Sequence, residues 1–394
     1  MTFYVFYLYI KYKQNNLKQN TMKTNIFFIA MCIIFGVQAQ NSVITIAETP
    51  VNEIAIIIDD IDGNRENEIL SMSKEVGGYL TLNISNIRDG VETQMTELYQ
   101  KNVRGLITID IFGDGKKSIA FIHSDSLSIL HQSKNRTFEK IESYYCGKGT
   151  DGISRGDINH DGFEDIVCSN CNSEYLRIFY GSPLGFNSTS VLDIATVNAG
   201  YNQIKVYDLD TNGFEDIVFL AGQGSKSGIY CYLNYGDGIN KTPVYFSMSV
   251  DNRGLTPTNM IFGKCFGFGE GLFINESWGG NTRMLRYNKE EQKLQSIDVP
   301  SWGSFSGSGM SYDIDGDGSD EFIQIGSNGV SIYDIKREKH IILDKSICSD
   351  HISNQLLAIG DINGDGESDI VQANDNGKIT IYKTNTSTAM IEKK

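Results

Sequence analysis

Residues 157–166 read DINHDGFEDI, and this ten-residue pattern returns along the chain at nearly constant intervals. Its close copies are DIDGNRENEI at 60, DLDTNGFEDI at 208, DIDGDGSDEF at 313 and DINGDGESDI at 361. Two weaker copies are DIFGDGKKSI at 110 and KCFGFGEGLF at 264, which keep the glycines but lose acids. Successive copies start 50, 47, 51, 56, 49 and 48 residues apart. A repeat of this length is typical of solenoids and propellers.

Each repeat has the same surroundings. A short apolar segment such as 54–58 precedes the decapeptide, and the decapeptide runs into a second one such as 217–220. A third, such as 175–180, follows a polar turn, and a weaker fourth precedes the next copy. Four strands in about 50 residues is the signature of a propeller blade. The sequence therefore predicts an all-β fold, a seven-bladed β-propeller of four-stranded antiparallel blades.

The N-terminal part predicts how the ring closes. After the last decapeptide there is room for only three strands, and residues 43–47, VITIA, form an unassigned strand near the start. A ring hides its sheet ends, whereas a linear stack needs caps. We therefore expect residues 43–47 to join the last blade.

Residues 23–39 have the features of a secretory signal peptide. A lysine precedes an apolar run from 26 to 37, and Val37-Gln38-Ala39 is a small-residue cleavage signal. We expect residues 1–39 to be removed, with Met22 as an alternative start, and residues 40–394 to form a single domain. The protein would then be secreted or periplasmic. The apolar run is shorter than the ~20 residues of a membrane span, so membrane insertion is not expected.

Charge limits the partners. The chain has a formal net charge of −15, which opposes binding to nucleic acid. Its acids cluster in the decapeptides, where they suit cations. We expect a monomer whose partner is a glycan or a protein.

The decapeptides predict calcium sites. Numbered from the first Asp, they carry side-chain oxygens at positions 1, 3, 5 and 9 and usually glycine at position 6. Calcium prefers six to eight oxygen ligands, and no imidazole or thiol occupies these positions. We predict about five structural Ca²⁺ ions, with these ligands: Asp60, Asp62, Asn64 and Glu68; Asp157, Asn159, Asp161 and Asp165; Asp208, Asp210, Asn212 and Asp216; Asp313, Asp315, Asp317 and Glu321; Asp361, Asn363, Asp365 and Asp369.

Two alternatives limit this assignment. Asn, Asp and Gly also favour turns that hold no ion. The first loop has Arg65 at the glycine position, and in the 110 loop Phe112 and Ser118 replace two ligands. We expect the 110 and 264 loops to be metal-free.

These decapeptides, with aromatic-glycine turns such as Phe179-Tyr180-Gly181, resemble the FG-GAP/VCBS repeats of integrin α propellers and of many secreted bacterial proteins. The resemblance covers essentially all of residues 40–394. It implies calcium loops between strands 1 and 2 of each blade and partner binding on the opposite face. It does not imply one function, because the family contains adhesion modules, glycan binders and polysaccharide lyases.

Six cysteines remain after residue 39, and they allow 15 disulfide pairings. Cys168-Ser-Asn-Cys171 has CxxC spacing but no second CxxC, so we interpret it as a turn, with or without a bridge, and not as a zinc site.

The sequence favours a binding or adhesion module without catalytic residues. The five histidines are scattered, and there is no GxSxG, HExxH or Walker motif. Trp278, Arg283 and Trp302 lie in or near glycine-rich connections and are the candidate ligand-binding residues, although either Trp could simply pack between blades. A lyase-like polysaccharide-degrading enzyme and a purely structural scaffold remain the alternatives.

Overall fold

The computed structural model divides the chain into two units, residues 1–41 and 42–394. It describes residues 43–48, 52–74, 80–86, 92–98, 103–134, 137–170, 172, 174–186, 191–197, 202–222, 226–248, 257–276, 282–297, 299, 309–326, 329–344, 356–373 and 378–383. The predicted signal peptide, residues 1–39, and its cleavage site lie outside the described residues.

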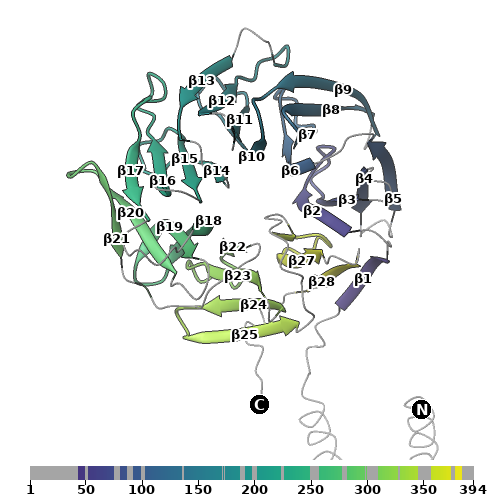
Figure 1. Cartoon of the computed structure of the whole chain (residues 1–394). Helices are drawn as coiled ribbons and strands as arrows, with labels where there is room; N and C mark the ends of the chain where they lie inside the picture. Colours follow the sequence, from purple (N-terminus) through teal and green to yellow (C-terminus); the bar gives the residue numbers. More distant parts are fainter. Residues whose placement is uncertain are drawn as a thin grey trace, which may run out of the picture. The chain divides into compact units, whose positions relative to one another are not determined.

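The second unit consists of seven four-stranded antiparallel sheets arranged in a ring (Figure 1). Blade 1 contains β2 (Asn52–Asp59), β3 (Glu68–Lys74), β4 (Leu80–Asn86) and β5 (Glu92–Leu98). Blade 2 contains β6 (Val103–Ile109), β7 (Ser118–His123), β8 (Ser126–Lys134) and β9 (Thr137–Tyr145). Blade 3 contains β10 (Thr150–Gly156), β11 (Asp165–Asn170), β12 (Tyr175–Phe179) and β13 (Val191–Ala195).

The remaining blades repeat this order. Blade 4 contains β14 (Asn202–Tyr207), β15 (Asp216–Ala221), β16 (Gly228–Tyr232) and β17 (Val244–Ser247). Blade 5 contains β18 (Pro257–Cys265), β19 (Gly269–Glu276), β20 (Arg283–Asn288) and β21 (Lys293–Ile297). Blade 6 contains β22 (Gly309–Tyr312), β23 (Glu321–Gly326), β24 (Gly329–Asp334) and β25 (Lys339–Asp344). Blade 7 contains β26 (Leu357–Gly360), β27 (Asp369–Ala373), β28 (Lys378–Tyr382) and the N-terminal β1 (Val43–Glu48).

The N-terminal strand closes the ring as predicted. β1 pairs antiparallel with β28, with Val43 opposite Tyr382 and Thr45 opposite Thr380. The last repeat supplies only three strands, so β1 covers the edge that β28 would otherwise leave unpaired. The predicted seven-bladed architecture and its closure are both confirmed.

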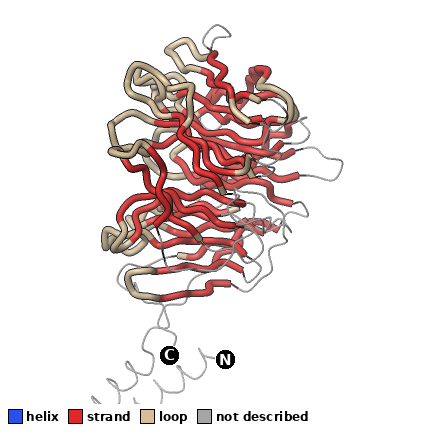
Figure 2. Tube along the Cα trace, turned by 60° about the vertical axis from the view of Figure 1, so that its left-hand side comes forward, coloured by secondary structure: helices blue, strands red, loops and turns tan. Residues whose placement is uncertain are grey.

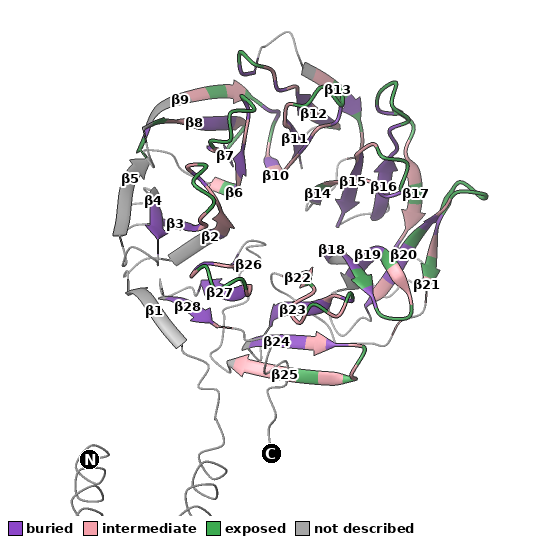
Figure 3. Cartoon of the chain, turned by 180° about the vertical axis from the view of Figure 1, so that it is seen from behind, coloured by how far each residue is buried: buried purple, intermediate pink, exposed green. Residues whose placement is uncertain are grey.

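The cores lie between blades. Described residues form six apolar clusters, and each cluster draws its members from adjacent blades. This explains why the second strands read as continuous apolar runs: all residues of β11, β15 and β27 are buried, because each of their faces packs against a neighbouring sheet (Figure 3).

Every decapeptide starts where the first strand of its blade ends and finishes in the second strand. The strand 1–2 loops of all blades therefore share one side of the ring, and most of the described loops, drawn in tan, lie on one side in Figure 2. Within the described ranges, the structure has no helix with the length and apolarity that a bilayer crossing requires.

Candidate metal centres

The Asp at position 1 organises the loop. In the 157 loop, the backbone N–H groups of Asp161 and Gly162 donate to the two carboxylate oxygens of Asp157 at 3.0 and 2.9 Å. The same two bonds recur from Asn212 and Gly213 to Asp208, at 3.0 and 2.9 Å. These bonds hold the loop in a tight curve without an ion, so the site is preorganised.

The curve requires left-handed backbone at two positions. Position 6 has φ between +83° and +92° at the glycines of the 110, 157, 208, 313 and 361 loops, and Arg65 adopts +70° in the first loop. Position 4 is also left-handed, with His160 at +58° and Thr211 at +54°. Arg65 thus keeps the loop geometry despite lacking the glycine, at some cost in backbone strain.

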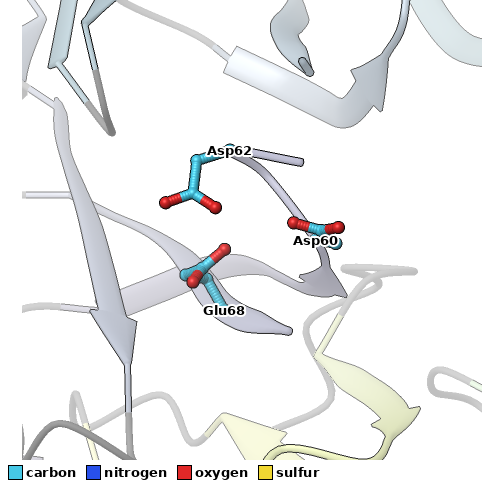
Figure 4. A group of neighbouring side chains, drawn as sticks. All are labelled: Asp60, Asp62 and Glu68. Carbon is cyan, nitrogen blue, oxygen red and sulfur yellow. The ribbon is translucent and has the colours of Figure 1, made fainter. Parts of the chain in front are cut away.

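Carboxylates at positions 1, 3 and 9 converge in three loops. Each residue offers an oxygen such that all three oxygens lie within 4.8 Å of one another. Figure 4 shows this for the first loop, where the three carboxylates face a common point. The converging groups are Asp60, Asp62 and Glu68; Asp208, Asp210 and Asp216; and Asp313, Asp315 and Glu321.

The 208 loop contains a carboxylate that is almost fully buried. Asp210 is 7% exposed, and its buried Oδ1 accepts no hydrogen bond from the residues that the structure describes. Burial raises the pKa of Asp210. A buried carboxylate oxygen that accepts no hydrogen bond is costly unless a cation lies against it. The donor set is made only of oxygens, which fits a hard cation such as Ca²⁺.

In the 157 and 208 loops, the carboxylate at position 9 accepts backbone hydrogen bonds on both of its oxygens. One oxygen of Asp165 accepts the N–H of Ile158 at 2.8 Å, and the other accepts the N–H of Gly181 at 2.8 Å. Asp216 is held in the same way by Leu209 and Asn234. Burial raises the pKa of Asp165 and Asp216 to about 7 and that of Glu321 to about 8. Without a cation these groups therefore resist ionisation.

The 157 and 361 loops differ because position 3 is asparagine. Asn159 Nδ2 donates to Asp161 at 2.9 Å, and Asn363 Nδ2 donates to Asp369 at 3.0 Å. In both loops the amide nitrogen is thus turned toward an acid. Rotating the amide by half a turn would present its oxygen instead, since the two ends of an amide are nearly isosteric. The structure brings the carboxylates together most tightly in the other three predicted sites.

Blade 2 replaces the lost ligand with a hydrogen-bonded network. Ser118, at position 9, lies 3.2 Å from His131 Nδ1, and His131 Nε2 lies 3.4 Å from Glu142. Phe112, at position 3, packs against the His131 ring at a centroid distance of 5.4 Å. The sequence alone paired no histidine with a nucleophile. Ser118 is only 3% exposed, however, so a substrate cannot reach its oxygen without rearrangement.

The 264 loop keeps the glycine geometry without the acids. Gly267 and Gly269 both have φ of +77°, matching positions 4 and 6. Positions 1 and 3 hold Lys264 and Phe266. The loop is reduced to a tight turn in which Cys265 pairs with Gly269.

Blade 6 supplies its own cations to its loop. Arg337, in the turn after β24, forms ion pairs with Asp315 and, at 2.9 Å, with Asp334. Lys336 Nζ lies 2.8 Å from Asp317. These side chains neutralise part of the charge of the most acidic loop, so its dependence on an ion should be smaller than that of the 208 loop.

We expect Arg337→Gln to make the blade 6 loop more dependent on calcium. In a chelator the substitution should lower the free energy of unfolding by about 1–2 kcal/mol, because the hydrogen bonds to Asp315 and Asp334 are lost. In calcium the ion compensates, and the loss should be smaller. Urea unfolding under both conditions measures the difference. Arg104→Gln is the control, since its 2.7 Å pair with Asp151 lies outside the loops. Equal losses with and without calcium would contradict the prediction.

In two loops an acid at position 8 ties the loop to the preceding blade, a feature that the sequence reasoning missed. Glu164 accepts the N–H of Asp110 at 2.6 Å, and Asp320 accepts the N–H of Lys264 at 2.8 Å. A Cβ on Gly263 would lie 3.0 Å from Asp320 Oδ2 and still closer to Ser311, so only glycine leaves room there. The signal was available as the recurring acid at position 8.

The candidate ligand residues are described only in part. Trp278 and Trp302 lie outside the described residues. Arg283 begins β20, where it pairs with Ile274 of β19, and its side chain is partly buried. The pairing of these residues into one surface stays a prediction.

These features define the class of protein: a seven-bladed β-propeller with acidic strand 1–2 loops. No family model matches the chain. Solved structures do resemble it. The chain is similar to BBS1N, solved in complex with ARL6DN, with a TM-score of 0.55 and 12% identity over 85% of this chain and 93% of that one.

Two further structures have comparable similarity. A lectin from Agrocybe aegerita that recognises non-reducing terminal N-acetylglucosamine gives a TM-score of 0.52 and 16% identity, over 85% of this chain and 95% of that one. The extracellular domain of BT4673 from B. thetaiotaomicron gives 0.51 and 15%, over 85% of this chain and 40% of that one. At these identities the likeness shows the shared propeller fold.

Proposed function

We propose that this chain is a calcium-stabilised propeller that acts as a binding module for a glycan or a protein partner. The observation that carries the calcium part is the convergence of three carboxylates in each of three equivalent loops, one of which holds the unpartnered Asp210 Oδ1. Turn chemistry alone does not require acids to meet at positions 1, 3 and 9.

Calcium would have a structural role in this proposal. The side chains at positions 1, 3, 5 and 9 would hold the ion, and the bound ion would neutralise carboxylates that otherwise repel one another. Because the ion binds only the folded loops, it raises stability by mass action. The same resemblance to FG-GAP/VCBS repeats motivates all five sites, and the geometry supports those at 60, 208 and 313 most directly.

We further propose that the protein is exported after cleavage near Ala39. The support is the apolar run and cleavage signal in residues 23–39. Outside the cytosol, modules of this kind bind calcium in the range of about 10⁻⁴–10⁻³ M. N-terminal sequencing of the exported protein tests the cleavage, and a mature end far from Gln40 would contradict it.

Two similar propellers support the proposed binding role. One was solved with a protein partner, and the other recognises a sugar, so this fold can present either kind of site. We place the ligand site on the face opposite the acidic loops, where the strand 2–3 connections lie. Trp278 and Trp302 would provide aromatic platforms there, and Arg283 a hydrogen-bonding cation.

We expect the calcium-loaded protein to capture a defined set of glycans or one protein partner. A glycan array and a pull-down with purified candidate partners measure this. Replacing Trp278 and Trp302 together with Ala should lower capture at least ~10-fold, because an anchoring aromatic contributes about 2 kcal/mol or more. Replacing the exposed Tyr235, in the strand 3–4 turn on the acidic-loop side, is the matched control.

Other outcomes would redirect the proposal. Unchanged capture by the double Trp variant would contradict the proposal that Trp278 and Trp302 bind the ligand. Shortened polysaccharide in the same incubation would favour the lyase-like alternative, and no capture of any kind would favour a structural scaffold.

A further inference from the structure

Two cysteines from adjacent blades meet in the core between blades 2 and 3. Cys146 follows directly after β9, and Cys168 lies in β11, opposite Ile153 of β10. Both side chains are 0% exposed, and both belong to the apolar cluster shared by these blades. Their Sγ atoms are 3.7 Å apart.

The pairing is selective among the described cysteines. Cys231 and Cys265 belong to apolar clusters farther around the ring, and neither has another described cysteine sulfur against it. Cys146 and Cys168 are thus the one contacting pair among the four described cysteines, and a bridge between them leaves three of the 15 complete pairings. A disulfide requires a separation of about 2.05 Å, so the two sulfur atoms must approach by about 1.7 Å.

We propose that Cys146 and Cys168 form a disulfide when the chain folds in the presence of a disulfide oxidant, such as oxidised glutathione or a protein disulfide. The thiolate of one cysteine attacks the oxidant's disulfide, which forms a mixed disulfide and releases one thiol. The second thiolate attacks the cysteine sulfur of the mixed disulfide and releases a second thiol. One external disulfide is reduced to two thiols, which take up the two protons that the cysteine thiols lose, and one Sγ–Sγ bond is formed.

Because both thiols are buried in the folded protein, the disulfide bond can form readily only at an early stage of folding. Burial and the contact with Cys146 raise the pKa of the Cys168 thiol, and only a thiolate attacks a disulfide. The oxidant must also reach sulfur atoms that have no exposed surface. The bond should therefore form before the two blades close on each other. Oxidation of the folded, reduced protein should be at least ~10-fold slower than oxidation during refolding.

The bridge joins the end of the outermost strand of blade 2 to the second strand of blade 3. It closes a loop over a separation of 22 residues. Constraining the unfolded chain in this way should raise the melting temperature of the oxidised protein by roughly 5 °C. The inference is independent of the proposed calcium and ligand sites.

Mass spectrometry tests the connectivity. The full chain is refolded with reduced and oxidised glutathione, quenched with acid, alkylated while denatured and digested with trypsin. Trypsin separates residues 141–148, which contain Cys146, from residues 156–177, which contain Cys168 and Cys171. We expect these two peptides to be linked, and the link to persist in Cys171→Ser and disappear in Cys168→Ser.

Two results would overturn the proposal. One is complete alkylation of Cys146 in the refolded protein, which includes the case of a bridge between Cys168 and Cys171. The other is a link that survives in Cys168→Ser but is lost in Cys171→Ser.

Stability provides a second measurement. Reductant should lower the melting temperature of the oxidised wild-type protein by roughly 5 °C. The melting temperatures of Cys146→Ser and Cys168→Ser should not respond to reductant. Cys231→Ser removes a buried thiol of another cluster and should respond as the wild type does. A wild-type protein whose linked peptide is present but whose melting temperature ignores reductant would contradict the stabilising role.

Discussion

We expect chelation of divalent cations to lower the melting temperature of the protein by about 10 °C. Three sites that are each saturated at 100 times their dissociation constant contribute roughly 2.7 kcal/mol apiece, and a domain of this size shifts by about 1.4 °C per kcal/mol. Calorimetry in excess calcium and in chelator measures the difference. An unchanged midpoint would remove the calcium part of the proposed function.

Two variants test which loop is responsible for the calcium-dependent change in melting temperature. Asp210→Ala removes the carboxylate that has the unpartnered oxygen, so in calcium it should lower the midpoint by roughly 4 °C, the share of one site. In chelator it should have little effect, because relief of repulsion from Asp208 and Asp216 offsets the lost contacts. Asp114→Ala, in the 110 loop, is the control and should shift the midpoint equally under both conditions. A calcium-dependent loss in Asp114→Ala would contradict the assignment of sites.

In chelator, we expect the protein to become less stable as the pH rises from 5 to 8. Burial raises the pKa of Asp165 and Asp216 to about 7 and that of Glu321 to about 8, all above their values in the unfolded chain. The folded state therefore binds these protons more tightly than the unfolded state. Their contribution is complete below the unfolded pKa and is lost as the pH passes 7 to 8.

The expected loss is at least ~3 kcal/mol, because one unit of raised pKa corresponds to about 1.4 kcal/mol and three groups contribute. Urea unfolding at pH 5, 6, 7 and 8 measures it. Asp216→Asn cannot titrate, so its slope against pH should be shallower than that of the wild type. In calcium the slope should vanish or reverse, since the ion requires the ionised carboxylates. A chelated protein whose stability rises with pH over this range would contradict the prediction.

The fold could be predicted because its determinants are local and repeated. Six of the seven decapeptides specify a curved loop through an acid at position 1 and left-handed residues, and all seven are followed by an apolar strand. Seven copies at one period, with only three strands in the last repeat, leave residues 43–47 as the closing strand. Arg65 shows the limit of this logic, because the loop forms there without glycine.

The candidate sites could be predicted less completely. The ligand positions followed from spacing, but spacing could not separate the loops with Asp at position 3 from those with Asn159 and Asn363. Orientation of an amide depends on its neighbours in space. The network of Ser118, His131 and Glu142 was also hidden, because its members come from three strands that only the sheet brings together.

The sequence by itself determined the number of blades, the closing strand and the positions of the acidic loops, because short-range turn chemistry and strand periodicity encode them. Only the tertiary structure decided which carboxylates meet, which loop carries its own cations at Lys336 and Arg337, and which two cysteines touch. Those contacts join residues of different strands or blades, and their distances are set by how the sheets pack around the ring.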